Sequence, residues 1–308
     1  MIRRTLASQD EPGLLAALRA DAVALGVEAD RTWHRHLLED PRELGTVLES
    51  MEESSEWLLV RRQPVLLEGA EAVFGEVIPV GPGFDAAHEA PAALANNAVD
   101  WAMTAAAPWE KLVFGPFGFD LVRTQLKLVA ALENIRLGPC PGVQMEEVQE
   151  FPPEIAGLAS TVASEVGALL VRDKALLDWR FTRRAGCEYR IGLARRGSEL
   201  VGCTVLRRAA FDGIPHEGLV CEWLASGSEP AVGNALRAYL VERARSDGAP
   251  RLVALVPDWH PEWFAFQRAG FRVARTRALV CARSRVRRHD AAWLSKNWYY
   301  TLADGSLA

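Results

Sequence analysis

The sequence predicts an α/β protein of two units in tandem, each with a mixed central sheet flanked by helices. Short apolar runs bounded by turn residues, which are typical of buried strands, alternate with segments whose apolar residues recur at helical spacing. Landmarks also recur at similar offsets: Pro91 and Pro230 are 139 residues apart, Leu112 and Leu252 are 140 apart, and Trp33 and Trp179 are 146 apart. Similar offsets indicate a duplication, although helices rich in small residues also resemble one another by coincidence.

The boundary between the two units is predicted by the stretch 137–142. It contains two glycines and two prolines in six residues, a composition typical of linkers. We therefore expect one unit over 1–140 and a second over 141–308.

Composition bounds the class of protein. The 308 residues are 49% hydrophobic and 24% charged, as in ordinary globular proteins. The net charge of −5 gives no general attraction to nucleic acid or to an anionic membrane. We expect a cytoplasmic protein, because no run of 18 apolar residues is present, the N-terminus lacks a secretory apolar core, and the five cysteines are scattered.

In the N-terminal half, apolar periodicity and turn residues define the elements. Leu14, Leu15 and Leu18 follow helical spacing, while Gln63-Pro64 and Glu68-Gly69 mark turns. Helices are predicted within 11–30, 30–38, 42–52, 90–106 and 120–133, and strands within 56–61, 72–80 and 111–114.

The C-terminal half alternates more regularly. Before residue 217 we predict a strand over 143–150, helices over 153–166 and 174–181, and a hairpin of strands 189–195 and 199–206. From Glu217 onward we predict a strand over 218–225, a turn over 226–230, a helix over 231–247, a strand over 251–256, a short helix ending at Gly270, and strands over 273–283 and 298–302. Pro230 suits the first turn of its helix, where a missing N–H costs nothing.

The stretch from Glu217 to Val273 resembles the GNAT superfamily of acyl-CoA-dependent N-acyltransferases. In that family a strand leads into a Gln/Arg-x-x-Gly-x-Gly/Ala turn that opens a helix. Here Gly233 matches the last position, whereas Ser228 and Ala231 replace the first and middle ones. The arrangement is also similar to two-domain bacterial GNAT-fold proteins, which have a Leu-x-Trp-Arg segment like 177–180.

The resemblance implies a coenzyme site in the C-terminal unit. Helix N-terminal amides and the helix dipole favour anions such as the coenzyme A pyrophosphate. The residues expected to bind acetyl-CoA or another acyl-CoA are Gly227, Ser228, Ala231, Val232, Gly233 and Asn234. A side chain at Gly233 is expected to intrude on the coenzyme rather than on the protein core. The turn over 81–90 keeps no such pattern, and no metal is expected.

Acyl transfer to an amine also needs a proton acceptor. Glu222 and Glu217 are the candidate bases; five residues apart, they lie on opposite faces of a regular strand, so only one lines a cleft. Glu222 stands in an apolar run, where desolvation raises a carboxyl pKa, although an exposed strand-face glutamate is the plainer interpretation. The family's proton-donating tyrosine is replaced by Phe266. Four residues are alternative acids: Tyr239, His260, Tyr299 and Tyr300.

The function expected from this resemblance is N-acyl transfer to a small amine or an aminoacyl group. Two alternatives stay open. One is a non-catalytic GNAT-fold binding or scaffold protein, favoured by Phe266 and the divergent turn. The other is an aminoacyl-tRNA-dependent transferase, favoured only by the basic cluster 283–288, which is more often a solvated loop. The rings of His34 and His36 diverge on a helix and predict no metal site.

Overall fold

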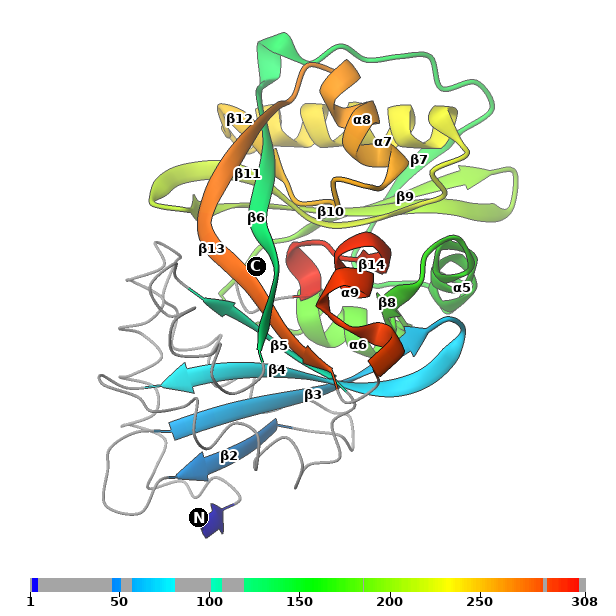
Figure 1. Cartoon of the computed structure of the whole chain (residues 1–308). Coiled ribbons are helices and arrows are strands. Elements are labelled where there is room, and N and C mark those ends of the chain that lie inside the picture. Colours follow the sequence, from blue (N-terminus) through cyan, green and yellow to red (C-terminus); the bar gives the residue numbers. More distant parts are fainter. Residues whose placement is uncertain are drawn as a thin grey trace. The chain divides into compact units, whose positions relative to one another are not determined.

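The computed structural model describes residues 2–4, 46–50, 57–80, 101–106, 119–184, 186–284 and 287–304. Figure 1 shows the chain. It divides into two compact units, one formed by residues 1–125 and 276–297, the other by residues 126–275 and 298–308. The boundary predicted at residue 140 therefore falls inside the second unit, and each unit is described separately.

The first unit contains an antiparallel set of strands in the order β1-β2-β3-β4, followed by β5 parallel to β4. These strands are β1 (Ile2–Arg4), β2 (Thr46–Ser50), β3 (Trp57–Leu67), β4 (Ala70–Val80) and β5 (Trp101–Ala106). The β3–β4 hairpin turns at Glu68 and Gly69, which both have positive φ. The strands predicted over 56–61 and 72–80 are thus confirmed. The strand predicted over 111–114 and the two helices predicted within 11–38 lie outside the described residues.

Three helix predictions for the N-terminal half are wrong where the structure describes them. Residues 46–50 and 101–106 form β2 and β5, and residues 120–131 form β6 (Asp120–Ala131). Pairing with a neighbouring strand overrides helix propensity in β6, where Leu128 to Ala131 pair with residues 251–254. The buried side chains of Leu128 and Ala130 project on one face at the two-residue spacing of a strand.

The second unit is built on a mixed sheet in the order β7-β9-β10-β11-β12-β6. Its other strands are β7 (Gln144–Val148), β9 (Arg190–Arg196), β10 (Glu199–Phe211), β11 (Ile214–Ala225) and β12 (Arg251–Ala254). All neighbours pair antiparallel except β11 and β12, which are parallel and joined by α7 (Pro230–Ser246). The strand, turn, helix and strand predicted from residue 218 onward are confirmed.

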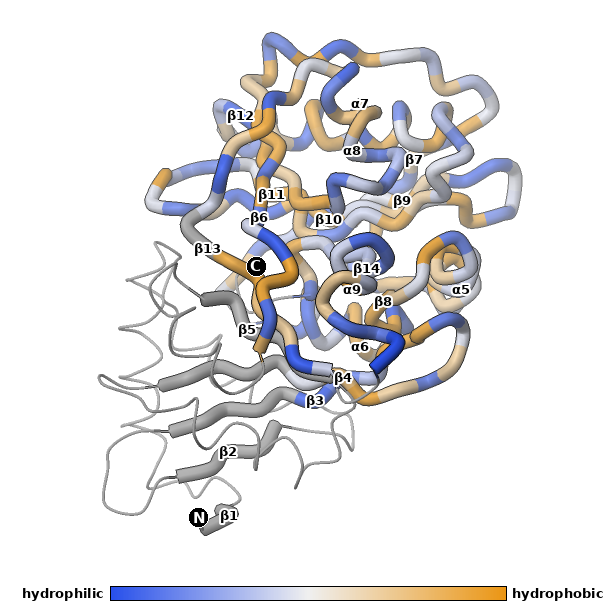
Figure 2. The backbone as a smooth tube through the Cα atoms, in the orientation of Figure 1, coloured by the Kyte–Doolittle hydropathy of each residue, from blue (hydrophilic) through white to orange (hydrophobic). Residues whose placement is uncertain are grey.

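Helices cover both faces of this sheet, with α7 and α8 (Pro261–Arg268) on one face and α5 (Ile155–Glu165) on the other (Figure 1). The core under α7 and α8 includes Trp223, Leu236 and Phe266. Gly202 lets α7 approach the sheet, since a Cβ there would lie 2.6 Å from Val232. Figure 2 shows β12 as hydrophobic, whereas α7 alternates between hydrophobic and hydrophilic residues, as expected of a helix with one buried face.

The Gly- and Pro-rich stretch 137–142 is a loop within the second unit rather than a linker between domains. It joins β6, which already belongs to this sheet through β12, to the edge strand β7. The Asn234 side chain in α7 donates a hydrogen bond of 3.0 Å to the Pro139 carbonyl. Gly138 packs so closely that a Cβ would lie 2.4 Å from the same side chain. The loop is therefore fixed onto the first turn of α7.

The last described residues return to the second unit. β14 (Trp298–Tyr299) pairs parallel with β8 (Ala168–Leu170), and a 3₁₀ turn follows over Leu302–Asp304. The strand predicted over 298–302 is therefore shorter than expected. The remaining elements are α6 (Lys174–Leu177), a π-helical turn over Asp178–Thr182, β13 (Arg272–Ser284) and α9 (Ala291–Asn297). Among the described residues, no helix has the length and apolar character needed to span a membrane.

Candidate functional site

The candidate site lies where β11 and β12 part. Their parallel pairing ends at Val220 and Ala254, while β11 continues to Ala225. The pairing of β11 with β10 is interrupted here, because Leu206 pairs with Val220 and Val205 with Glu222. One residue, Cys221, is thus extra on β11, which is the definition of a β-bulge.

The bulge corrects the expectation that Glu217 and Glu222 lie on opposite faces. Glu217 stands opposite Ala209, and Glu222 stands opposite Val205, four residues earlier on β10. Residues directly opposite one another share a face, and residues four apart on a strand do too. The extra residue therefore brings both glutamates to the same face of the sheet.

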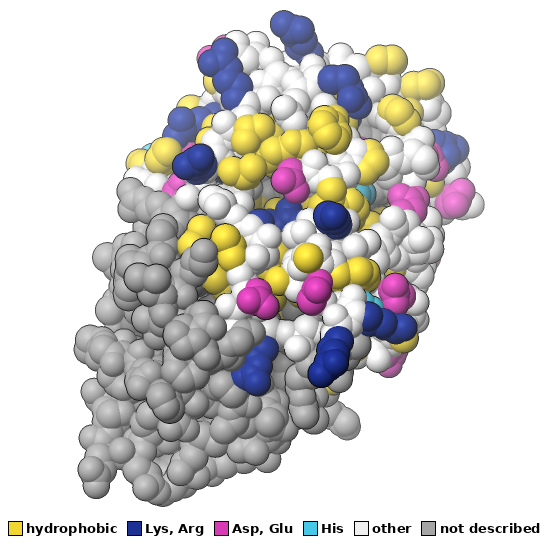
Figure 3. Space-filling view, viewed as in Figure 1, with side chains coloured by type: hydrophobic (Ala, Val, Ile, Leu, Met, Phe, Trp, Pro, Cys, Tyr) yellow, Lys and Arg dark blue, Asp and Glu magenta, His cyan; other side chains and the backbone are white. Residues whose placement is uncertain are grey.

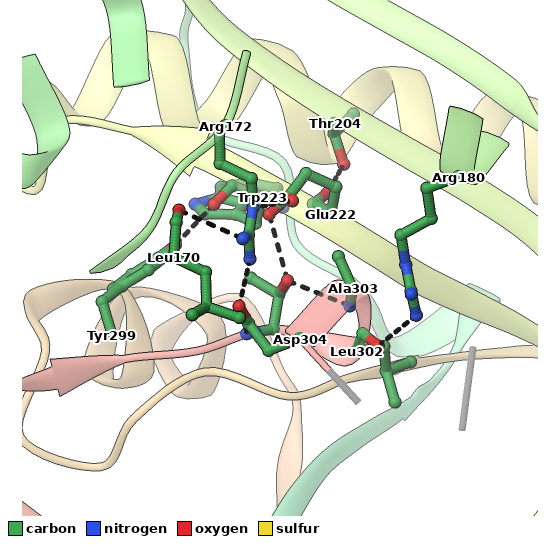
Figure 4. Close-up of polar contacts among 11 residues, drawn as sticks. Leu170, Arg172, Arg180, Thr204, Glu222, Trp223, Tyr299, Leu302, Ala303 and Asp304 are labelled. Carbon is green, nitrogen blue, oxygen red and sulfur yellow. Dashed lines mark hydrogen bonds and ion pairs between the residues drawn. The ribbon is translucent and has the colours of Figure 1, made fainter. Parts of the chain in front are cut away.

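Glu222 is the centre of a buried polar network (Figure 4). Its side chain is fully buried and accepts hydrogen bonds from the Arg172 Nε at 2.6 Å, the Thr301 hydroxyl at 3.0 Å and the Trp223 backbone N–H at 3.0 Å. Arg172 also donates to Asp304 at 2.6 Å. One guanidinium thus lies between two carboxylates, with every group contributed by the second unit.

Burial sets the electrostatics of this network. Desolvation raises the pKa of Glu222, an effect that the Arg172 charge opposes and the Asp304 charge reinforces. Burial lowers the pKa of Arg172, but the charges and hydrogen bonds of Asp304 and Glu222 together outweigh it and raise this pKa, so the guanidinium is permanently charged. Glu222 therefore binds a proton more readily than an exposed glutamate, as expected from its apolar sequence context.

Glu217, the other predicted base, lies near the opposite end of β11 and is also buried. Its carboxylate forms an ion pair with Arg251, which begins β12. The structure records no contact between Glu217 and the described residues of the Arg172 network. The two candidate bases share a face but have separate partners.

The turn predicted to hold a pyrophosphate already holds an anionic group. The Gly227 N–H donates to one carboxylate oxygen of Glu165 at 3.1 Å, and the Ser226 hydroxyl donates to the other at 2.5 Å. The Ser228 N–H donates to the Ser226 hydroxyl oxygen at 3.3 Å. Glu229, at the N-cap of α7, is ion-paired with Arg196 at 2.5 Å. The turn thus donates hydrogen bonds to carboxylate oxygens, and the same donors suit phosphate oxygens.

The first turn of α7 places the other predicted coenzyme residues. Ala231 is partly exposed, and Val232 is buried against the sheet. A Cβ on Gly233 would lie 3.0 Å from both the Arg237 guanidinium and the Glu262 carboxylate, which form a buried ion pair at 2.8 Å. A side chain at Gly233 would therefore intrude on the protein itself, contrary to the expectation that it would meet only the coenzyme.

Two of the four alternative acids, Tyr299 and Tyr239, have their hydroxyls engaged in hydrogen bonds. Tyr299 donates to the Trp223 carbonyl at 2.5 Å and Tyr239 to Glu147 at 3.1 Å, and burial raises the pKa of both phenols. Burial lowers the pKa of His260 to about 4, so its ring is neutral at pH 7. Phe266, in place of the family tyrosine, packs between Trp223 and Phe271.

Sequence reasoning missed Arg172, Asp304 and Glu165. A charged residue directly after the apolar run 168–171 was the one available signal for Arg172. Its partners lie 50 and 132 residues further along the chain, so no spacing rule reveals them. Glu165 looked like an ordinary helix-terminal glutamate, because its contact with Gly227 depends on how α5 packs.

Two further sequence features are the histidine pair His34 and His36, considered as a metal site, and the basic cluster 283–288, considered as a tRNA-binding site. Among the residues that the structure describes, no group of three or more His, Cys, Asp or Glu side chains could hold a metal, and His34 and His36 lie outside that part of the chain. The basic cluster is divided between β13 and a short 3₁₀ turn, where Arg288 pairs with Glu68 at 3.3 Å. On the face in Figure 3, described Lys and Arg side chains stand apart, between acidic and hydrophobic ones.

Comparison with solved structures identifies the fold. The chain is similar to a conserved protein of unknown function from Enterococcus faecalis V583, described as "Probable N-Acyltransferase" (TM-score 0.62, 13% identity, 96% of this chain and 73% of that one). It is also similar to GCN5-related N-acetyltransferases from Anabaena variabilis ATCC 29413 (TM-score 0.63, 11% identity, 92% and 72%) and Kribbella flavida (TM-score 0.58, 16% identity, 92% and 71%). The chain therefore has the mixed α/β GNAT fold. No protein-family model and no curated protein matches the sequence.

Proposed function

We propose that this chain is an acyl-CoA-dependent N-acyltransferase acting on a small amine or an aminoacyl group. The observation that carries the proposal is the turn between β11 and α7, which presents a backbone N–H and a hydroxyl to an anion beside two parting strands. The fold shared with N-acetyltransferase structures supports it. In this proposal the coenzyme pyrophosphate contacts residues 227–234, which include the small residues Gly227, Ser228 and Ala231.

The reaction requires that the acceptor nitrogen attack the thioester carbonyl carbon. A C–N bond forms, the C–S bond breaks, and the sulfur leaves as a thiolate while the nitrogen loses a proton. Of the two carboxylates, Glu222 suits the role of proton acceptor better, because burial raises its pKa and it lies beyond the last β11–β12 pair. Glu222 has no exposed surface, so the acceptor reaches it through an intervening water or after a side-chain movement.

Coenzyme binding is expected to stabilise the fold. A ligand that binds only the folded state adds about 2.7 kcal/mol at about 100 times its dissociation constant, so acetyl-CoA should raise the melting temperature. The measurement is thermal unfolding of the full chain with acetyl-CoA, longer acyl-CoAs and, as a control, adenosine. An unchanged melting temperature with every acyl-CoA would refute coenzyme dependence.

The base assignment predicts different kinetics for the two glutamates. Removing a general base lowers kcat/KM by about 10²–10⁴-fold, so Glu222→Gln should show a loss of this size and lack the acid limb of the pH–rate profile. Glu217→Gln should keep both the limb and a rate within about tenfold of wild type. These rates are to be measured with a panel of small amines. An unchanged acid limb in a folded Glu222→Gln protein would exclude Glu222 as the base.

A non-catalytic GNAT-fold binding protein is the second candidate. Both glutamates are buried in ion pairs, and Phe266 belongs to the core rather than to a proton-donating site. This candidate predicts acyl-CoA binding without turnover of any amine. A tRNA-dependent transferase rests only on the basic residues of 283–288, and it predicts tRNA binding that weakens steeply with salt.

A further inference from the structure

Glu165 is the last residue of α5, yet its carboxylate is bound by a turn that precedes another helix. Gly227 and Ser226 each donate one hydrogen bond to it, at 3.1 and 2.5 Å. Both contacts are exposed to solvent. A carboxylate and a phosphate oxygen seek the same donors at such a turn, so the two cannot occupy these donors together.

The surroundings make this contact reversible. Glu165 lies at the C-terminal end of α5, where the partial negative charge of the helix disfavours a carboxylate. The last turn of α5 contains no basic residue that could offset this effect. The glutamate side chain is exposed and can turn into water without disturbing the core. A ligand with several anionic oxygens therefore displaces it at low cost.

We propose that Glu165 is an internal competitor that closes the anion-binding turn when no acyl-CoA is present. The inference rests on the proposed function, because it concerns the same turn. When an internal group occupies a site for most of the time, the apparent dissociation constant rises in inverse proportion to the fraction of open molecules. Removing the charge of Glu165 should thus strengthen coenzyme binding, which is the opposite of what most site substitutions do.

The test compares Glu165→Gln with wild type by calorimetric titration of coenzyme A at fixed ionic strength. We expect the variant to bind roughly tenfold more tightly, the change produced by losing a charge-assisted contact of moderate strength. Glu154→Gln is the matched control, since it removes the same charge from the exposed other end of α5, about 16 Å away along the helix axis. It should bind coenzyme A as wild type does.

Each outcome has a definite meaning. The internal competitor is supported if only Glu165→Gln binds coenzyme A more tightly than wild type. It is also supported if Glu165→Gln binds coenzyme A while wild type and Glu154→Gln show no binding. Equal binding by all three proteins, or equal tightening in Glu154→Gln, overturns the competitor and leaves the proposed coenzyme site intact. Absence of coenzyme A binding in all three, with melting temperatures that show folded proteins, overturns the proposed function and the competitor together.

Discussion

Replacing Arg172 with alanine should destabilise the second unit by about 3–5 kcal/mol, the usual cost of breaking a buried ion pair. The change leaves the carboxylates of Glu222 and Asp304 buried without their shared guanidinium. Urea unfolding of the full chain measures the effect. Arg195→Ala is the control, since Arg195 pairs with the exposed Glu146 and its loss should cost less than about 1 kcal/mol.

The same variant should show a stronger pH dependence of stability than wild type. The folded chain keeps a proton on Glu222 at pH values where the unfolded chain has lost it, because the folded pKa is raised. Folding therefore takes up protons in this window, and stability falls as pH rises from the ordinary glutamate pKa to the raised one. Without Arg172 the folded-state pKa of Glu222 rises further. The stability lost by Arg172→Ala relative to wild type should therefore be larger at about pH 8 than at about pH 5. An equal loss of stability at the two pH values would show that the pKa of Glu222 is the same in the folded and the unfolded chain.

The second large effect is expected from Gly270→Ala, with a loss of about 3 kcal/mol. Gly270 follows α8 with a φ of 104°, which costs a residue with a side chain about 1–3 kcal/mol. In addition, a Cβ would lie 2.4 Å from the Asn134 carbonyl oxygen, and such overpacking costs a further 1–3 kcal/mol or so.

Gly248→Ala separates these two contributions. Gly248 follows α7 with a φ of 71°, but a Cβ there meets no atom within 4 Å. Its replacement should therefore cost only the backbone strain, about 1 kcal/mol. Equal melting temperatures for the two variants would mean that the backbone near Asn134 moves away from the new Cβ at no cost in stability.

The sequence predicted the fold best where local signals agreed. From residue 218 onward, apolar runs, Pro230 and Gly270 all indicated the strand–helix–strand order that the structure has. β6 was misread because its Leu- and Ala-rich sequence favours a helix in isolation, and only pairing with β12 makes it a strand. Such pairing joins residues more than a hundred positions apart and leaves no periodic trace.

The candidate site was predictable in its residues but not in their relations. Glu222 was singled out from its apolar context, and its burial is confirmed. The bulge at Cys221 reversed the expected facing of Glu217, since one extra residue changes strand parity. The partners Arg172 and Glu165 come from separate elements, so only the folded chain brings them to β11 and its turn. The tandem repeat and the coenzyme contacts stay predictions.

The closing of the Arg172 network by Asp304 has a consequence for how the protein is made. Asp304, which completes this network, is separated by 132 positions from the arginine it binds, so it is synthesised well after that arginine. Domains generally fold as units during synthesis, and contacts between distant residues form slowly. The nascent second unit therefore stays incomplete until Asp304 has been synthesised, and its exposed apolar strands need protection from aggregation for that time.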